Sequence, residues 1–228
     1  MTRADVIALQ ALELMKSCHD FDSTVSIESL DTIQKHYSIP TEYVLHGPTP
    51  GQHPYHICPE GFNISIDALE AGLRFSLHPV IGECLGWWRI SPSQVAPNSW
   101  RYLITFLGEC RGSGIVPTRD LFLSCFRLCK GQGGYYLTTG VGFRVGGAPS
   151  NNKGWKTWFL FVSRRQGCNF GVEWSTHPIS NIPPNLTDQE SVLVRRMKGI
   201  LSASREIRNL IEEWLVEAGL IPTSRGTF

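Results

Sequence analysis

Apolar residues recur at helical spacing through most of the first half of the chain. Val6, Leu9 and Leu12 share a broad apolar face that predicts a helix over residues 3–18. A second, shorter helix is predicted over 27–37 and ends before Pro40. The same spacing predicts further helices at 66–73, 79–88, 100–111 and 121–130.

The period of the pattern changes at Gly131. Three later runs are aromatic and β-branched and alternate like strands, at 135–143, 156–164 and 170–174. Residues 40–62 are rich in proline and are interpreted as an irregular connector. The expected fold class is therefore α+β, with a helical N-terminal half, a small, mostly antiparallel sheet and a long C-terminal helix.

The last segment reads as one long amphipathic helix. Thr187 and Glu190 have the spacing of a capping box, and Gly219 and Pro222 end the pattern. Inside it, apolar residues follow a four-three spacing for about four heptads. This seam either packs on its own domain or joins copies in a homo-oligomer; the self-association residues would be Ile200, Ile207, Ile211 and Trp214.

These patterns divide the chain into three parts. They are an N-terminal helical segment at 1–36, a central domain at 37–178 and the C-terminal helix at 186–220. The 228 residues are 42% hydrophobic and 18% charged, which excludes an intrinsically disordered chain.

Composition also bears on where the protein works. No apolar run approaches the length of a transmembrane helix, so no membrane partner is expected. The seven cysteines are an odd number, and no signal peptide is recognisable at the N-terminus. We therefore expect an intracellular protein, and the sequence does not distinguish nucleus from cytoplasm.

Short catalytic signatures are missing from the sequence. It has no adjacent aspartates for a two-metal polymerase, no phosphate-binding loop and no nucleophile elbow. His53, His56 and Cys58 form a compact set of ligand types, but the proline-rich connector around them favours an accidental cluster over a metal site. We expect no catalytic residues, no metal, no cofactor and no enzymatic activity.

Charge distribution gives one positive signal. Residues 121–172 carry seven cations and no Asp or Glu, although the whole chain has a net charge of only +1. Aromatic residues are interleaved with these cations, a combination that binds single-stranded RNA or DNA. The candidate nucleic-acid-binding residues are Arg144, Lys153, Trp155, Lys156, Arg164 and Arg165. The competing interpretation is a sheet whose basic edges block aggregation.

Four local strings resemble one known family. They are YSIPTEY at 37–43, ALEAGLRFSLHP at 68–79, SQVAPNSW at 93–100, and KGWK at 153–156 followed by Phe159, Phe161 and Val162. Their order and spacing are similar to those of the gypsy-type transposon domain of plants, which occurs in retrotransposon-derived reading frames ahead of coiled-coil segments. The resemblance covers about residues 37–176, and Ser76 stands where members of the family often have proline.

The resemblance implies a mobile-element origin and no known catalytic residue. It favours a structural or interaction module, related to a Gag-type particle protein, that self-associates through the C-terminal helix. A nucleic-acid-binding module that uses the basic aromatic sheet is the alternative. In either case the strings should form scaffold, with Leu73, Phe75, Leu77 and Trp100 where elements meet.

Overall fold

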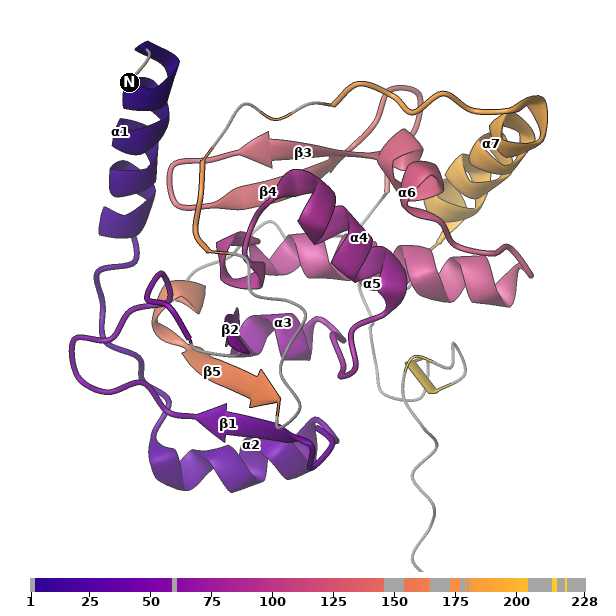
Figure 1. The fold of residues 1–228 in the computed structure, drawn as a ribbon. Coiled ribbons are helices and arrows are strands. Elements are labelled where there is room, and N and C mark those ends of the chain that lie inside the picture. The colour runs from indigo at the N-terminus through magenta and orange to yellow at the C-terminus, as the bar shows by residue number, and fades with distance from the viewer. Residues whose placement is uncertain are drawn as a thin grey trace, which may run out of the picture.

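A computed structural model describes residues 3–58, 61–145, 154–164, 173–176, 179, 181–204, 215–216 and 220. Helices and small antiparallel sheets share one apolar core, and the predicted α+β class is confirmed (Figure 1). The helices are α1 (Arg3–Ser17), α2 (Leu30–His36), α3 (Ile66–Glu70), α4 (Pro79–Trp88), α5 (Pro97–Gly112), α6 (Arg119–Cys125) and α7 (Asp188–Ala203).

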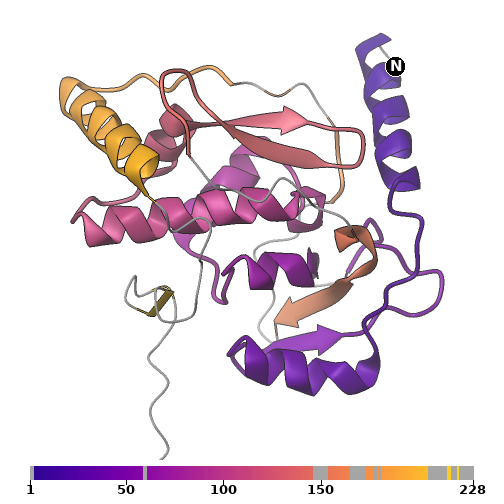
Figure 2. The same cartoon turned by 180° about the vertical axis from the view of Figure 1, so that it is seen from behind.

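The central helix is α5, which begins at Pro97 because a proline fits the first helical turn. Ten of its 16 residues are buried, so neighbours cover it on several sides. Helices α3 and α7 pack against it, as does a two-stranded hairpin, and Figure 2 shows α7 beside it from behind. The family-like string that leads into α5 therefore enters the middle of the core.

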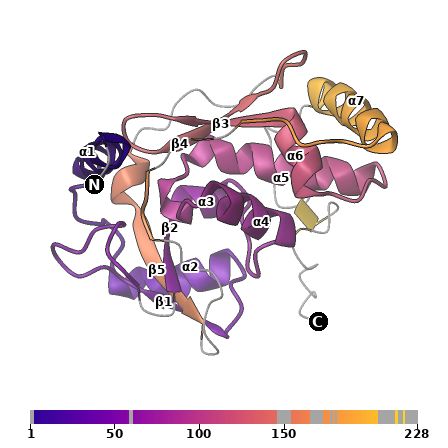
Figure 3. The same cartoon turned by 45° about the horizontal axis from the view of Figure 1, so that its top comes forward.

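The five strands within the described residues form two separate antiparallel sheets. The first has the order β1–β5–β2, with β5 (Phe159–Arg164) between β1 (Tyr43–His46) and β2 (Gly61–Ser65). Its register pairs Tyr43 with Arg164 and Ser65 with Phe159. The second is the hairpin of β3 (Phe126–Lys130) and β4 (Tyr135–Thr139), which lies over α5 in Figure 3.

Two sequence predictions are wrong in this region. The supposed connector 40–62 contains β1 and the start of β2. The helix predicted over 121–130 ends at Cys125, and residues 126–130 form β3. In β3, Phe126 and Leu128 are buried and Arg127 is exposed, which is the alternation of a strand covered on one face. Pairing with β4 thus overrides the helical spacing.

The predicted long C-terminal helix is also shorter than expected. Thr187 and Glu190 form the predicted capping box, but α7 ends at Ala203, and Ser204 has extended backbone angles of φ −63° and ψ 137°. Beyond it, Leu215 is helical and buried, and its side chain lies against Gly72. Ile207, Ile211, Trp214 and the first three residues of the strand predicted over 170–174 lie outside the described residues, and residues 173–174 are not in a strand.

Candidate functional site

The candidate nucleic-acid-binding residues are spread over the molecule. Lys153 and Arg165 lie outside the described residues. Trp155 is 7% exposed, and its ring meets His19 edge to face at 4.9 Å. Lys156 lies in the turn before β5, while Arg164 ends that strand, roughly 20 Å further along. Arg144 is exposed after the β3–β4 hairpin, so the four described residues do not gather into one patch.

The other exposed cations of the acid-free stretch lie on the β3–β4 hairpin. Arg127 and Lys130 are exposed on β3, and Tyr136 on β4 is 43% exposed. Cross-strand pairing places Tyr136 opposite Cys129, so Tyr136 and Arg127 share the outer face. The sequence placed these residues in the basic stretch 121–172 but not among the candidate binding residues, and it predicted a helix for 121–130.

The free edge of β3 is closed by a side chain. Asn181 accepts a hydrogen bond from the Leu128 amide at 3.0 Å and donates one to the Leu128 carbonyl at 2.9 Å. The amide of one asparagine therefore imitates a neighbouring strand where the chain passes β3 on its way to α7 (Figure 1).

The predicted self-association seam lies partly inside the molecule. Val194, Met197 and Leu201 are buried, and the Met197 sulfur lies 3.8 Å from the Cys110 sulfur of α5. Ile200 is half-buried against the same core. The described part of the seam packs on its own domain, and association through Ile207, Ile211 and Trp214 stays a prediction.

The string at 93–100 binds the free edge of β4. The Ala96 amide donates to the Tyr135 carbonyl at 2.8 Å, and the Leu137 amide donates to the Ser99 hydroxyl at 2.8 Å. Trp100 is fully buried in the first turns of α5. The polar residues of this string are therefore used inside the fold.

The string at 68–79 has similar internal roles. The Arg74 guanidinium donates to the carbonyls of Leu69 and Leu73, at 2.8 and 2.9 Å, beyond the end of α3. His78 caps α4 by accepting a hydrogen bond from the Val80 amide, with Pro79 in the first turn. Gly72 has a φ of +95°, and a side chain there would meet Leu215 and Ile104.

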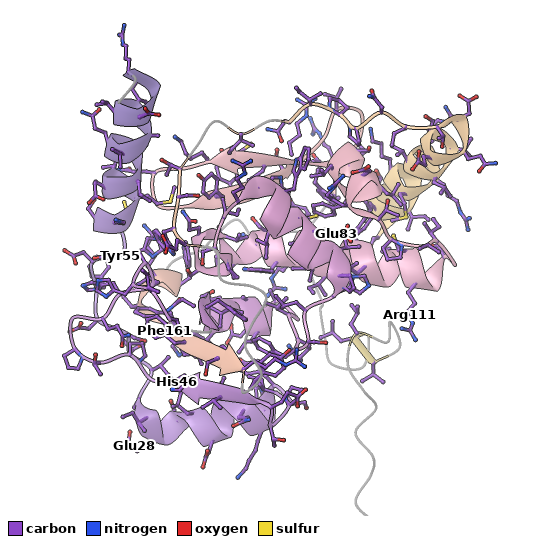
Figure 4. All side chains as sticks on the ribbon, viewed as in Figure 1. Glu28, His46, Tyr55, Glu83, Arg111 and Phe161 are labelled. Atoms are coloured by element: carbon purple, nitrogen blue, oxygen red, sulfur yellow. The ribbon has the colours of Figure 1, made fainter. Side chains whose placement is uncertain are left out.

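A cavity opens between the 54–58 loop, β2 and residues 173–174, with a volume of about 130 Å³. Its lining includes Tyr55, Cys58, Asn63, Glu173 and Trp174. In Figure 4, Tyr55 lies on the loop between β1 and β2, below the C-terminal end of α1. The Lys16 ammonium of α1 lies 5.7 Å from the centre of that ring.

Hydrogen bonds hold two walls of this cavity in place. The Trp174 indole N–H donates to the Ser93 hydroxyl at 2.8 Å, and Ser93 donates to the Pro54 carbonyl at 3.4 Å. The Trp174 and Tyr55 rings meet at an angle of 68° with centroids 5.8 Å apart. One serine thus ties the loop to the 173–174 segment.

Two buried polar side chains beside the cavity have incomplete hydrogen bonding. Asn63 is 3% exposed, and within the described residues neither its Nδ2 nor its Oδ1 has a partner. His19 is 1% exposed; its Nε2–H donates to the Gly133 carbonyl at 2.7 Å, and its Nδ1 has no partner in the described part of the chain. The pKa of His19 is lowered to about 4, mainly by burial and to a smaller extent by the nearby Lys156 charge, against the opposing effect of the Gly133 hydrogen bond.

The histidines of the 53–58 segment have other partners. The His53 Nε2 lies 3.1 Å from the Asp20 carboxylate, and the His56 Nδ1 accepts from the His53 amide at 3.0 Å. Among the residues that the structure describes, no group of three or more His, Cys, Asp or Glu could hold a metal ion. Within the same residues, no helix has the length and apolarity needed to cross a bilayer.

Residues 64–130 match the model of a protein family described as "Putative gypsy type transposon". The matched span runs from β2 to β3 and contains two of the four strings, at 68–79 and 93–100. The predicted relationship to gypsy-type transposon proteins is confirmed over this span. No match was found among curated proteins or among solved structures.

Proposed function

We propose that this chain, transposon-related over residues 64–130, is a non-enzymatic structural and interaction module of a plant gypsy-type retrotransposon, comparable to a Gag-region protein. The observation that carries the proposal is the use of the family-like strings. Ser99, Arg74 and His78 direct their polar groups to the chain's own backbone. Residues committed to backbone contacts in this way stabilise a scaffold and are not available to act as a nucleophile or an acid–base pair.

The proposal includes self-association, which we assign to the segment of the chain after α7. An Ile207→Asp, Ile211→Asp double variant should convert an oligomer into a folded monomer, because a charge at a seam position opposes burial. Sedimentation equilibrium at rising protein concentration measures the change. Val192→Asp is the matched control, since Val192 on α7 is 54% exposed and its loss should leave the oligomer intact.

The possible outcomes distinguish self-association of the C-terminal segment from its packing within one chain. A wild-type chain that sediments as a monomer at every concentration rejects self-association. A double variant that loses its folded core shows that these isoleucines pack internally. Neither result affects the proposed scaffold role, because that role is argued from residues 68–100.

Nucleic-acid binding is a second candidate, and the exposed hairpin face favours it. Arg127 and Tyr136 present a cation and an aromatic ring on one surface. A salt-dependent titration with single-stranded RNA and DNA should show weaker binding at high salt, and weaker binding still for Arg127→Ala and Tyr136→Ala. Lys35→Ala, on exposed α2, is the control. Equal binding by all four proteins would reject the hairpin as the site.

A further inference from the structure

We infer that the outer face of helix α1 pairs with the same face of a second copy of this chain, with the two helices antiparallel. This outer face consists of exposed residues that share one side of the helix, namely Arg3, Val6, Ile7, Gln10, Glu13 and Leu14. The inference deepens the proposed self-association and rests on it, but it places a contact within the described residues, away from the C-terminal segment.

Helix α1 is held to the rest of the protein by its inner side. Met15 on that side is 1% exposed, and the Gln94 side-chain amide donates to its sulfur at 3.3 Å. The Thr176 hydroxyl donates to the Ala8 carbonyl. In Figure 1 the helix lies at the edge of the molecule, with its N-terminal end projecting from it. The outer face is therefore open to another molecule.

The outer face carries large apolar side chains. Ile7 is 57% exposed, Leu14 is 51% exposed and Val6 is 40% exposed. Ile7 and Leu14 are seven residues apart, so two helical turns place them one above the other in a stripe. Single apolar residues are normal on a protein surface, whereas a contiguous apolar patch marks an interaction site. Removing this stripe from water favours association.

The order of residues along the stripe selects a second copy as the partner. An interface with twofold symmetry uses the same surface on both molecules, so each residue must suit the residue that it meets. In an antiparallel pair centred near Gln10, Ile7 meets Leu14 of the second copy, and Leu14 meets its Ile7. The two Gln10 amides lie near the axis, where each offers a donor and an acceptor to the other. The same helix in reverse therefore covers both apolar positions of the stripe.

Charge favours an antiparallel pair over a parallel one. Arg3 and Glu13 lie toward opposite ends of the outer face and carry opposite charges. Reversing the second helix brings its Glu13 toward Arg3, at both ends of the contact. A parallel pair would instead oppose like charges, which costs affinity. Glu13 also lies 3.0 Å from the Lys16 ammonium of its own helix, so Arg3 adds a second cation and a modest gain.

The size of the contact sets its strength. Helix α1 has 15 residues, so its outer face is about 22 Å long. Two helices of this length bury less surface than the roughly 800 Å² per partner of a stable protein interface. We therefore expect a weak dimer that forms as the protein concentration rises.

Sedimentation equilibrium of the full chain, up to millimolar concentration, tests the inference. Ile7→Asp and Leu14→Asp should each raise the dimer dissociation constant by about tenfold or more, because each would bury a charge in the stripe. Both residues are exposed in the monomer, so both variants should keep the wild-type melting temperature. Ile27→Asp is the matched control, since Ile27 is 73% exposed and lies outside α1.

Charge exchange tests the pairing of Arg3 with Glu13. Arg3→Glu and Glu13→Arg should each weaken the dimer. The double exchange should restore it, because opposite charges then face each other again in reverse.

Cysteine cross-linking tests the direction of the helices. An equimolar mixture of Ile7→Cys and Leu14→Cys should form a covalent dimer faster than either variant alone, because only the mixture places two introduced thiols opposite each other. The wild type under the same oxidant measures the background from the native cysteines.

Three results would overturn the inference. One is a wild-type chain that stays a monomer at every concentration; if it also binds phosphatidylcholine vesicles, the outer face belongs to a lipid surface. Another is a dimer that the Ile207→Asp, Ile211→Asp variant dissociates and Ile7→Asp leaves intact, which assigns self-association to the C-terminal segment. The third is Ile7→Cys that cross-links alone as fast as with Leu14→Cys. A dimer that only the α1 variants dissociate supports the inference and rejects the C-terminal contact.

Discussion

His19 is a residue whose ionisation is coupled to folding. The ring is buried between Trp155 and Trp174, with both centroids 4.9 Å away, and the Nδ1 atom has no partner within the described residues. A second proton on the ring would place an unsolvated charge there, which is why the pKa of His19 is lowered to about 4. Acid therefore opposes folding at this position.

The sign of the pH dependence follows from the lowered pKa. His19 binds a proton more readily in the unfolded chain, so its contribution to stability is complete above pH 6.5 and is lost as the pH falls toward 4. We expect the free energy of unfolding to drop by about 3 kcal/mol across this interval from His19 alone. Urea titrations of the wild type and His19→Gln at several pH values measure the difference.

The control for His19 is His36, which is exposed at the end of α2. His19→Gln should show a flatter pH dependence than the wild type and the His36→Gln control. Equal slopes for all three proteins would show that His19 protonates without cost.

Trp100 is expected to stabilise the fold by packing alone. The side chain is fully buried, and its indole nitrogen has no hydrogen-bond partner in the described part of the chain. Trp100→Ala should cost about 3–5 kcal/mol through the cavity it leaves. Trp100→Phe should cost less because it keeps a ring and breaks no hydrogen bond. Thermal melts of the two variants measure both losses of stability. A wild-type melting temperature for Trp100→Ala would contradict the scaffold role.

At the scale of elements, the β3 edge depends on Asn181. The two hydrogen bonds to Leu128 close a strand edge that would otherwise be open to water or to another chain. Asn181→Ala should cost about 1 kcal/mol and speed the hydrogen exchange of the Leu128 amide. Asn185→Ala removes an exposed asparagine from the same segment and should leave that exchange rate unchanged. If the Leu128 amide stays protected from exchange in Asn181→Ala, Asn181 does not close the edge of β3.

Helix α7 belongs to the core through one face only. Met197 is fully buried beside Cys110, whereas Val192 on the same helix is 54% exposed. Met197→Ala should cost about 2–5 kcal/mol, and Val192→Ala less than about 0.5 kcal/mol. Chemical denaturation measures both; similar costs for the two variants would mean that α7 does not dock on α5 as described.

At the scale of the whole molecule, we expect the family-matched span not to fold alone. Strand β2 pairs only with β5 among the described strands, and β3 pairs only with β4. Both partners lie after residue 130, outside the match. A fragment of residues 64–130 should therefore lack the cooperative thermal transition of the full chain, measured by circular dichroism. A cooperative melt of the fragment would show that its helices suffice for a core.

The sequence by itself determined the helices whose signals are local. Pro79 starts α4, and Thr187 with Glu190 starts α7 through a capping box, whereas α5 begins at Pro97, three residues before its predicted start. Each of these signals acts within one helical turn, so no distant contact is needed to read it. The scaffold role of Trp100 was also predictable, because a large apolar side chain at the start of an apolar helix is best placed in the core.

Only the tertiary structure decided the features that depend on contacts between residues far apart in the sequence. Residues 126–130 fit a helix or a strand by their spacing, and pairing with β4 made them β3. The predicted basic sheet became two sheets, which separated Arg164 from the hairpin cations, whereas the Lys156 side chain lies against Gly133 in the turn of the hairpin. The candidate cavity could not be foreseen, because Tyr55, Asn63 and Trp174 meet only when β2 and residues 173–174 are brought together across more than 100 positions of sequence. Local preferences start elements, but long-range contacts choose between strand and helix and assemble a site.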